Sequence, residues 1–194
     1  MSIEIVNLSK KFKDIFAVNN ISFEINPNKT VGLLGPNGCG KTTSIGMMLG
    51  LIKPTSGRIL IKNKNINTLD RNKLLSIMNF ASPYVELPKK LSVKQNLQIY
   101  GRLYGVKDLS SRINELAEDL NLKDFLNKKT GELSSGQKNR VSLAKSLINK
   151  PEILLLDEPT ASLDPDIGDY VRSYIQSYKS KNKVTILLAS HNMA

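Results

Sequence analysis

The segment GPNGCGKTT, residues 35–43, constrains this chain more than any other part of its sequence. It fits the pattern G-x-x-x-x-G-K-[ST], follows the apolar run TVGLL and opens a helix predicted over residues 41–51. Glycines at this spacing let successive backbone N–H groups turn around an anion, and a helix start adds a favourable field. A glycine-rich turn with a surface lysine is the simpler alternative, but the strand before and the helix after favour a phosphate-binding loop.

A pair of acidic residues at the end of another apolar run is the second candidate for a functional site. ILLLDE places Asp157 and Glu158 directly after four apolar residues. The carboxyl ends of parallel strands face the ligand crevice, so Asp157 is predicted near a metal and Glu158, pointing the other way along the pleat, near an attacking water. An acidic pair that only caps the next helix is the alternative.

Alternation of apolar runs with amphipathic segments indicates an α/β layered domain. The runs at 3–8 and 20–25 suit half-exposed antiparallel strands, whereas three continuous apolar runs suit buried parallel strands. We therefore expect an α/β P-loop NTPase with a mainly parallel central sheet, an N-terminal antiparallel β-subdomain and an inserted helical lobe. The expected extents are one domain over 1–194, a core of about 1–84 and 151–194, and a lobe of about 85–150.

Composition excludes some classes of function. One cysteine, Cys39, rules out a disulfide framework, and we expect no signal peptide in the first residues, because charged residues precede any long apolar run. No apolar run approaches the roughly 18 residues needed to span a bilayer, so a membrane role would come through a partner. The net charge of +11 comes from scattered lysines without interleaved aromatics, which favours solvated faces over a nucleic-acid site.

The motifs GPNGCGKTT, LSSGQ, ILLLDEPT, SLD and SH, in that order, resemble the nucleotide-binding subunit of an ATP-binding cassette (ABC) transporter. The resemblance covers the chain from about Ile3 to its last residue. It implies ATP and Mg²⁺ as ligands, with Thr42 and Asp157 holding the metal. The nucleotide contacts that it implies in the phosphate loop are Gly35, Asn37, Gly38, Cys39, Gly40, Lys41, Thr42 and Thr43.

The same resemblance assigns roles outside the loop. Phe12 matches the aromatic that stacks on adenine, with a core phenylalanine as the alternative. Glu158 matches the catalytic base and His191 a switch residue that contacts the γ-phosphate. Asp164 matches the aspartate of a loop that signals across a dimer.

The LSSGQ segment matches a signature that acts on a partner. Ser134 and the N–H groups near Gly136 are expected to cap the γ-phosphate that the other subunit's phosphate loop holds. The physics fits this role, because a helix N-terminus offers free N–H donors and a favourable field for anions. The alternative is that LSSG only caps its own helix.

Three departures from the family pattern stand out. Ser135 occupies a position where glycine is usual, and serine does not easily adopt φ > 0. Ser82 stands where most members have a glutamine that contacts Mg²⁺ and the membrane partner. The chain also ends just past His191, where family members continue, which suggests a truncated C-terminal end.

The expected function is an ATP-binding and ATP-hydrolysing subunit that powers a membrane permease through ATP-dependent dimerisation. The expected partners are an integral membrane permease and a second nucleotide-binding subunit, at the cytoplasmic face of the membrane. YGRLYG and the serine in the signature favour an exporter by resemblance. The alternative is a soluble ABC ATPase acting on nucleic acid or ribosomes, although no coiled-coil heptads and no second cassette are visible.

Overall fold

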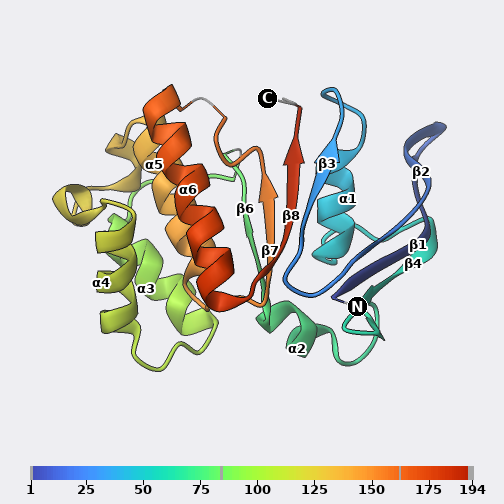
Figure 1. The fold of residues 1–194 in the computed structure, drawn as a ribbon, viewed down its shortest axis with the longest axis horizontal. Helices are drawn as coiled ribbons and strands as arrows, with labels where there is room; N and C mark the ends of the chain where they lie inside the picture. The colour runs from blue at the N-terminus through green and yellow to red at the C-terminus, as the bar shows by residue number, and fades with distance from the viewer. Residues whose placement is uncertain (1, 84, 162, 192–194) are drawn as a thin grey trace.

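Figure 1 presents the computed structural model, which describes residues 2–83, 85–161 and 163–191. Two four-stranded sheets organise the chain, with strand orders β2-β1-β4-β5 and β3-β8-β7-β6. The strands are β1 (Ile3–Phe12), β2 (Ile15–Ile25), β3 (Thr30–Leu34), β4 (Ser56–Ile61), β5 (Lys64–Asn65), β6 (Met78–Ala81), β7 (Ile153–Asp157) and β8 (Thr185–Ser190). The α-helices are α1 (Lys41–Met48), α2 (Arg71–Ser76), α3 (Val93–Leu103), α4 (Leu109–Asp119), α5 (Ser135–Leu147) and α6 (Pro165–Asn182).

The second sheet is parallel and central. β7 pairs with β6 on one side and β8 on the other, and β8 also pairs with β3. Every residue of β7 is buried, because helices cover both faces of this sheet: α1 lies on one side, and α5 and α6 lie on the other (Figure 1). A strand buried on both faces must be apolar throughout, which is why ILLL carries no alternation.

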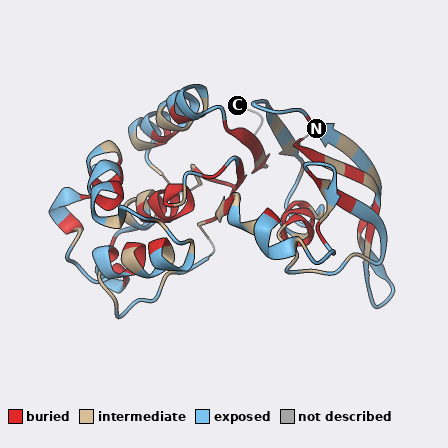
Figure 2. Ribbon diagram, turned by 90° about the horizontal axis from the view of Figure 1, so that it is seen from below, coloured by how far each residue is buried: buried red, intermediate tan, exposed pale blue. Residues whose placement is uncertain are grey.

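The first sheet is antiparallel and pairs β1 with β2 and β4. Its inward residues, among them Ile3, Ile5 and Ile59, pack with α1 and one face of the parallel sheet. A separate apolar cluster joins the opposite face of the parallel sheet to α3–α6. Buried residues therefore line both sides of the central sheet, while the outer helix faces are exposed (Figure 2).

The α/β class with its parallel central sheet and antiparallel N-terminal sheet is confirmed. The helix predicted over residues 41–51 is shorter, because the chain turns at Leu49 and Gly50 adopts φ 65°. Helix α2 was missed by the sequence analysis. It has six residues and buries only Leu74, so it leaves no apolar periodicity to detect.

Candidate functional site

The phosphate loop joins β3 to α1, as its sequence context predicts. Gly40 is the N-cap of α1 with φ 94°, a left-handed conformation that suits glycine. A Cβ on Gly40 would lie 2.1 Å from the backbone oxygen of Ala17, so β2 closes directly over this end of the loop. This approach of β2 could not be predicted, because contact between segments that are distant along the chain leaves no local sequence pattern.

Lys41 lies inside the loop and is buried. Its Nζ donates to the backbone oxygens of Gly35 at 2.6 Å and Pro36 at 2.9 Å. These two carbonyls hold the ammonium group against the beginning of the loop. A phosphate in this loop would therefore meet an ammonium already in place.

The residues predicted as metal ligands lie together. The Thr42 hydroxyl donates to Asp157 Oδ2 at 2.9 Å, although 115 positions separate them in sequence. Burial raises the pKa of the Asp157 carboxyl, the Thr42 hydrogen bond opposes this shift, and the nearby Glu158 charge adds to it. A hydroxyl and one carboxylate are the hard oxygen donors that suit Mg²⁺ when phosphates and water complete its shell.

Glu158 leaves β7 in a left-handed conformation, with φ 51°. The expectation that it points oppositely along the pleat is therefore wrong, because Glu158 lies outside the strand that ends at Asp157. Its Oε1 accepts the backbone N–H of His191 at 2.8 Å and lies 2.6 Å from His191 Nδ1. His191 follows β8, so neighbouring parallel strands bring the two residues together.

A cavity of about 150 Å³ joins the loop to the two carboxylates. Its lining residues are Asn37, Gly38, Gly40, Lys41, Thr42, Thr43, Asp157 and Glu158. Glycines, an ammonium, hydroxyls and two carboxylates thus converge on one polar space. Such a set can bind a polyphosphate with a divalent cation and place a carboxylate beside a water. Gly35 and Cys39 belong to the same loop, and Cys39 is exposed.

Phe12 ends β1 and is 49% exposed, so it is not a core residue. It shares a strand face with Lys10, whose Nζ lies 4.8 Å from the ring centroid. Lys10 pairs with Val18, and Val18 Cγ2 would lie 3.0 Å from a Cβ on Gly40. Phe12 therefore stands on the hairpin face that is turned toward the phosphate loop.

The LSSGQ segment begins α5 with a capping box. Ser134 Oγ accepts the Gln137 N–H at 3.2 Å, and Gln137 Oε1 accepts the Ser134 N–H at 3.0 Å. Ser135 is the first residue of the helix and is not among the described residues with positive φ, so a serine fits there without strain. Ser134 and Gly136 do not line the cavity at the phosphate loop, as far as the chain is described.

Two further residues from the sequence analysis have defined places. Asp164 is the N-cap residue of α6, with Pro165 at the first helical position. Ser82 is buried just beyond β6. Ala81 pairs with Leu156 in the sheet, so Ser82 leaves its strand beside Asp157.

A parallel sheet whose carboxyl edge carries a phosphate loop, a hydroxyl–carboxylate pair and a glutamate defines a P-loop nucleotide-binding domain. The family model for ABC transporters matches residues 18–161, and the chain belongs to this family.

Named relatives agree over nearly the whole chain. The Nod factor export ATP-binding protein I of Burkholderia lata is 35% identical over 193 residues, 98% of this chain and 63% of the relative. The ABC transporter ATP-binding protein NatA of Bacillus subtilis is 34% identical over 197 residues, 98% of this chain and 80% of the relative. The chain thus spans less than two thirds of the Nod factor export protein.

Solved structures agree with this fold. The ATP-binding cassette MJ0796, in a dimeric post-hydrolysis state bound to ADP and Pi, has a TM-score of 0.90 and 27% identity. The match covers 98% of this chain and 88% of that cassette. No helix in the described residues is long and apolar enough to cross a membrane.

Proposed function

We propose that this chain is the ATP-hydrolysing subunit of a membrane transporter and that it works by ATP-dependent dimerisation. In this proposal ATP lies in the phosphate loop with its base near Phe12. Lys41 and the loop N–H groups bind its phosphates, and Thr42 and Asp157 would hold Mg²⁺. The metal, when bound, would offset charge on the phosphates.

The hydrolytic step uses this chain's own carboxylate. The Glu158 carboxylate would accept a proton from the attacking water, and the backbone N–H of His191 would hold it in place through Oε1. The left-handed backbone at Glu158 turns this residue out of the strand and into the cavity lining. A carboxylate at this place next to the phosphate loop fits the role of a general base.

One observation carries the dimer model. The helix start capped by Ser134 does not line the cavity that Lys41 and Asp157 line, so this chain's own signature does not complete its own site. A second copy could supply it. ATP between two such surfaces would join them, and hydrolysis would release them.

The direction of transport is proposed to be export. The support is the name of the Burkholderia relative, which describes Nod factor export, and the serine-bearing signature of this chain. The permease would anchor the subunit at the cytoplasmic face of the membrane. The chain would form a single ATPase domain, in which the helical lobe is inserted between β6 and β7.

The test is the oligomeric state of the Glu158→Gln variant. Sedimentation velocity with ATP and Mg²⁺ should reveal a dimer, and the same protein with ADP should remain monomeric. Addition of Ser134→Arg, which places a bulky cation at the helix start, should abolish the dimer while ATP still binds. A Glu158→Gln protein that binds ATP but stays monomeric at every concentration would contradict the proposal.

A further inference from the structure

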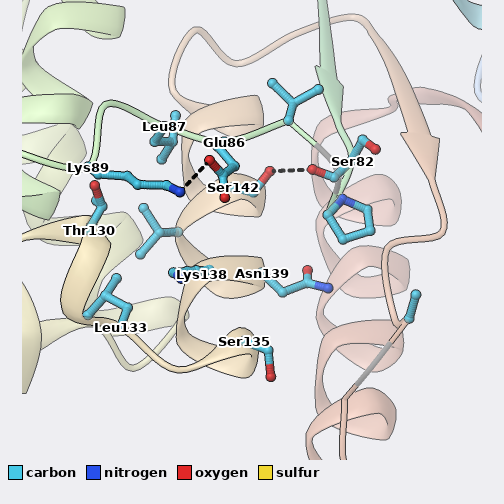
Figure 3. A pocket seen from close by; sticks show the side chains of 14 residues that line it. Ser82, Glu86, Leu87, Lys89, Thr130, Leu133, Ser135, Lys138, Asn139 and Ser142 are labelled. Atoms are coloured by element: carbon cyan, nitrogen blue, oxygen red, sulfur yellow. Dashed lines mark hydrogen bonds and ion pairs between the residues drawn. The ribbon is translucent and has the colours of Figure 1, made fainter.

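Two side chains of α5 hold the backbone where the chain leaves β6. Lys145 Nζ donates to the Phe80 oxygen at 2.7 Å, and Ser142 Oγ donates to the Ser82 oxygen at 3.4 Å. Figure 3 shows the Ser142–Ser82 bond at the edge of a pocket between α5 and the segment after β6. Since Ser142 and Lys145 are three residues apart, they lie on one face of the helix.

Lys145 is unusual in its surroundings. It is 9% exposed, and no ion pair joins it to a carboxylate within residues 2–83, 85–161 and 163–191. From β6 it meets the Phe80 carbonyl, and from α3 the titratable Tyr100, whose ring centroid lies 5.5 Å from Nζ. Burial lowers the pKa of Lys145 to about 8. An ammonium buried without an acid is costly, so this position costs stability that a methionine would not.

The held segment lies between the two parts of the proposed site. On one side, the pairing of Ala81 with Leu156 places Ser82 beside Asp157. On the other side, α5 runs from the Ser134 cap to Leu147, with Lys145 near its end. Any shift of the segment after β6 would therefore act on the helix whose start carries Ser134.

We propose that Lys145 is a positioning residue, which together with Ser142 fastens the segment leaving β6 to α5 and so sets where the Ser134 helix start stands relative to Asp157. The inference rests on the proposed ATP-dependent dimerisation. The connection runs through the backbone carbonyls of Phe80 and Ser82, so it does not depend on which side chain stands at position 82.

The test compares Lys145→Met and Lys145→Arg in the Glu158→Gln background. Methionine has a similar length but no donor, whereas arginine keeps a charged donor. We expect Lys145→Met to raise the dimer dissociation constant in ATP and Mg²⁺ about 10-fold, which is about 1.4 kcal/mol. The affinity of monomer for a fluorescent ATP analogue should change less than about 2-fold, and Lys145→Arg should restore dimerisation to within about 3-fold.

A pH series separates positioning from plain stability. As pH rises through about 8, Lys145 loses its charge and its hydrogen bond and ring contact weaken, so dimerisation should weaken relative to Lys145→Arg. Fold stability moves the opposite way, because the unfolded chain still binds the proton up to the ordinary lysine pKa. Dimerisation that instead rises with stability over this range would overturn the inference.

Two controls complete the design. Ser2→Ala removes a buried hydroxyl contact with Thr185, 3.1 Å away in the core, and should lower the melting temperature without weakening the dimer. Ser142→Ala is the fallback if Lys145→Met does not fold, with an expected loss of about 3-fold. If the parent Glu158→Gln protein itself does not dimerise, the proposed function fails. If the parent dimerises and Lys145→Met and Ser142→Ala match it, only the inference fails.

Discussion

Glu158 Oε1 accepts the backbone N–H of His191 at 2.8 Å and also lies 2.6 Å from the Nδ1 of the same residue. The side chain of Glu158 is almost fully buried, whereas that of His191 is about half exposed. Residues that follow neighbouring strands thus meet at the edge of the sheet. The backbone bond fixes the carboxylate independently of the imidazole.

Removal of the Glu158 charge should stop turnover and leave binding intact. Glu158→Gln keeps the shape of the side chain but is a far weaker base, so we expect kcat to fall at least about 100-fold. ATP affinity should stay within about 3-fold. Steady-state phosphate release and equilibrium binding of an ATP analogue measure the two quantities. Near-normal hydrolysis would show that another group is the base.

The Asp157 carboxyl should cost stability when no metal is bound. Burial raises its pKa in the folded state, so the charged form is disfavoured there and stability is lost as pH rises above the ordinary range of an aspartate. Asp157→Asn should therefore melt higher than the parent at pH 7.5 without Mg²⁺. The difference should shrink at acid pH. Thermal melts of both proteins across pH, with and without Mg²⁺-ATP, measure these differences. Addition of Mg²⁺-ATP should raise the melting temperature of the parent more than that of Asp157→Asn.

Two glycine substitutions should differ sharply. Gly40→Ala must place a Cβ against the Ala17 oxygen at φ 94°, so we expect a loss on the order of 3 kcal/mol and weak ATP binding. Gly136 is helical, and its nearest neighbour would be Leu163 Cδ2 at 3.6 Å from an added Cβ. Gly136→Ala should fold as well as the parent, and any defect should appear only in dimerisation. Urea unfolding and sedimentation distinguish the two.

Phe12 and Phe16 form a matched pair on the β1–β2 hairpin. Both are about half exposed. Phe12 pairs with Ile15 across the hairpin, so these two side chains share one face of the sheet. Phe16 is the residue after Ile15, so its ring lies on the opposite face from the ring of Phe12. Stacking of a base on an aromatic ring contributes about 1–3 kcal/mol, so Phe12→Ala should weaken ATP binding roughly 10-fold. Phe16→Ala should have no effect. Equal losses in both variants would point to the hairpin fold and away from stacking.

The stability of the whole fold should depend on Lys145 above pH 8. Its pKa of about 8 in the folded state lies below the ordinary 10.5, so the unfolded chain binds more protons between these values and stability rises with pH. Relative to Lys145→Met, which does not titrate, the gain should approach about 3 kcal/mol. Burial raises the pKa of Tyr174, which makes the stability of the fold decrease as pH rises. This effect is the same in the parent and in Lys145→Met, so it cancels when the two proteins are compared. Urea titrations from pH 7 to 10.5 measure it.

Local pattern was enough to predict β7, because a strand that is buried on both faces must be apolar along its length. The expectation that the apolar run of β3 is also buried is wrong, because β3 lies at the edge of the sheet and its residues Thr30, Gly32 and Leu34 are exposed. The phosphate loop was equally visible, since its glycines, Lys41 and Thr42 are adjacent in sequence. The conformation of Glu158 was not visible, because alternation along a strand says nothing about the residue that leaves it. The contacts of Lys145 with Phe80 and of Ala17 with Gly40 join distant segments and have no local signal.

The capping box at Ser134 has an effect on the hydroxyl itself. The Gln137 N–H occupies a lone pair of Oγ, so the hydroxyl hydrogen is not used within the cap and can be given to an incoming oxygen. Because Oγ is held when the chain folds, the rotamer entropy of this serine is already lost before two subunits meet. A nucleotide bound to another subunit would then meet a Ser134 hydroxyl that is already fixed in position.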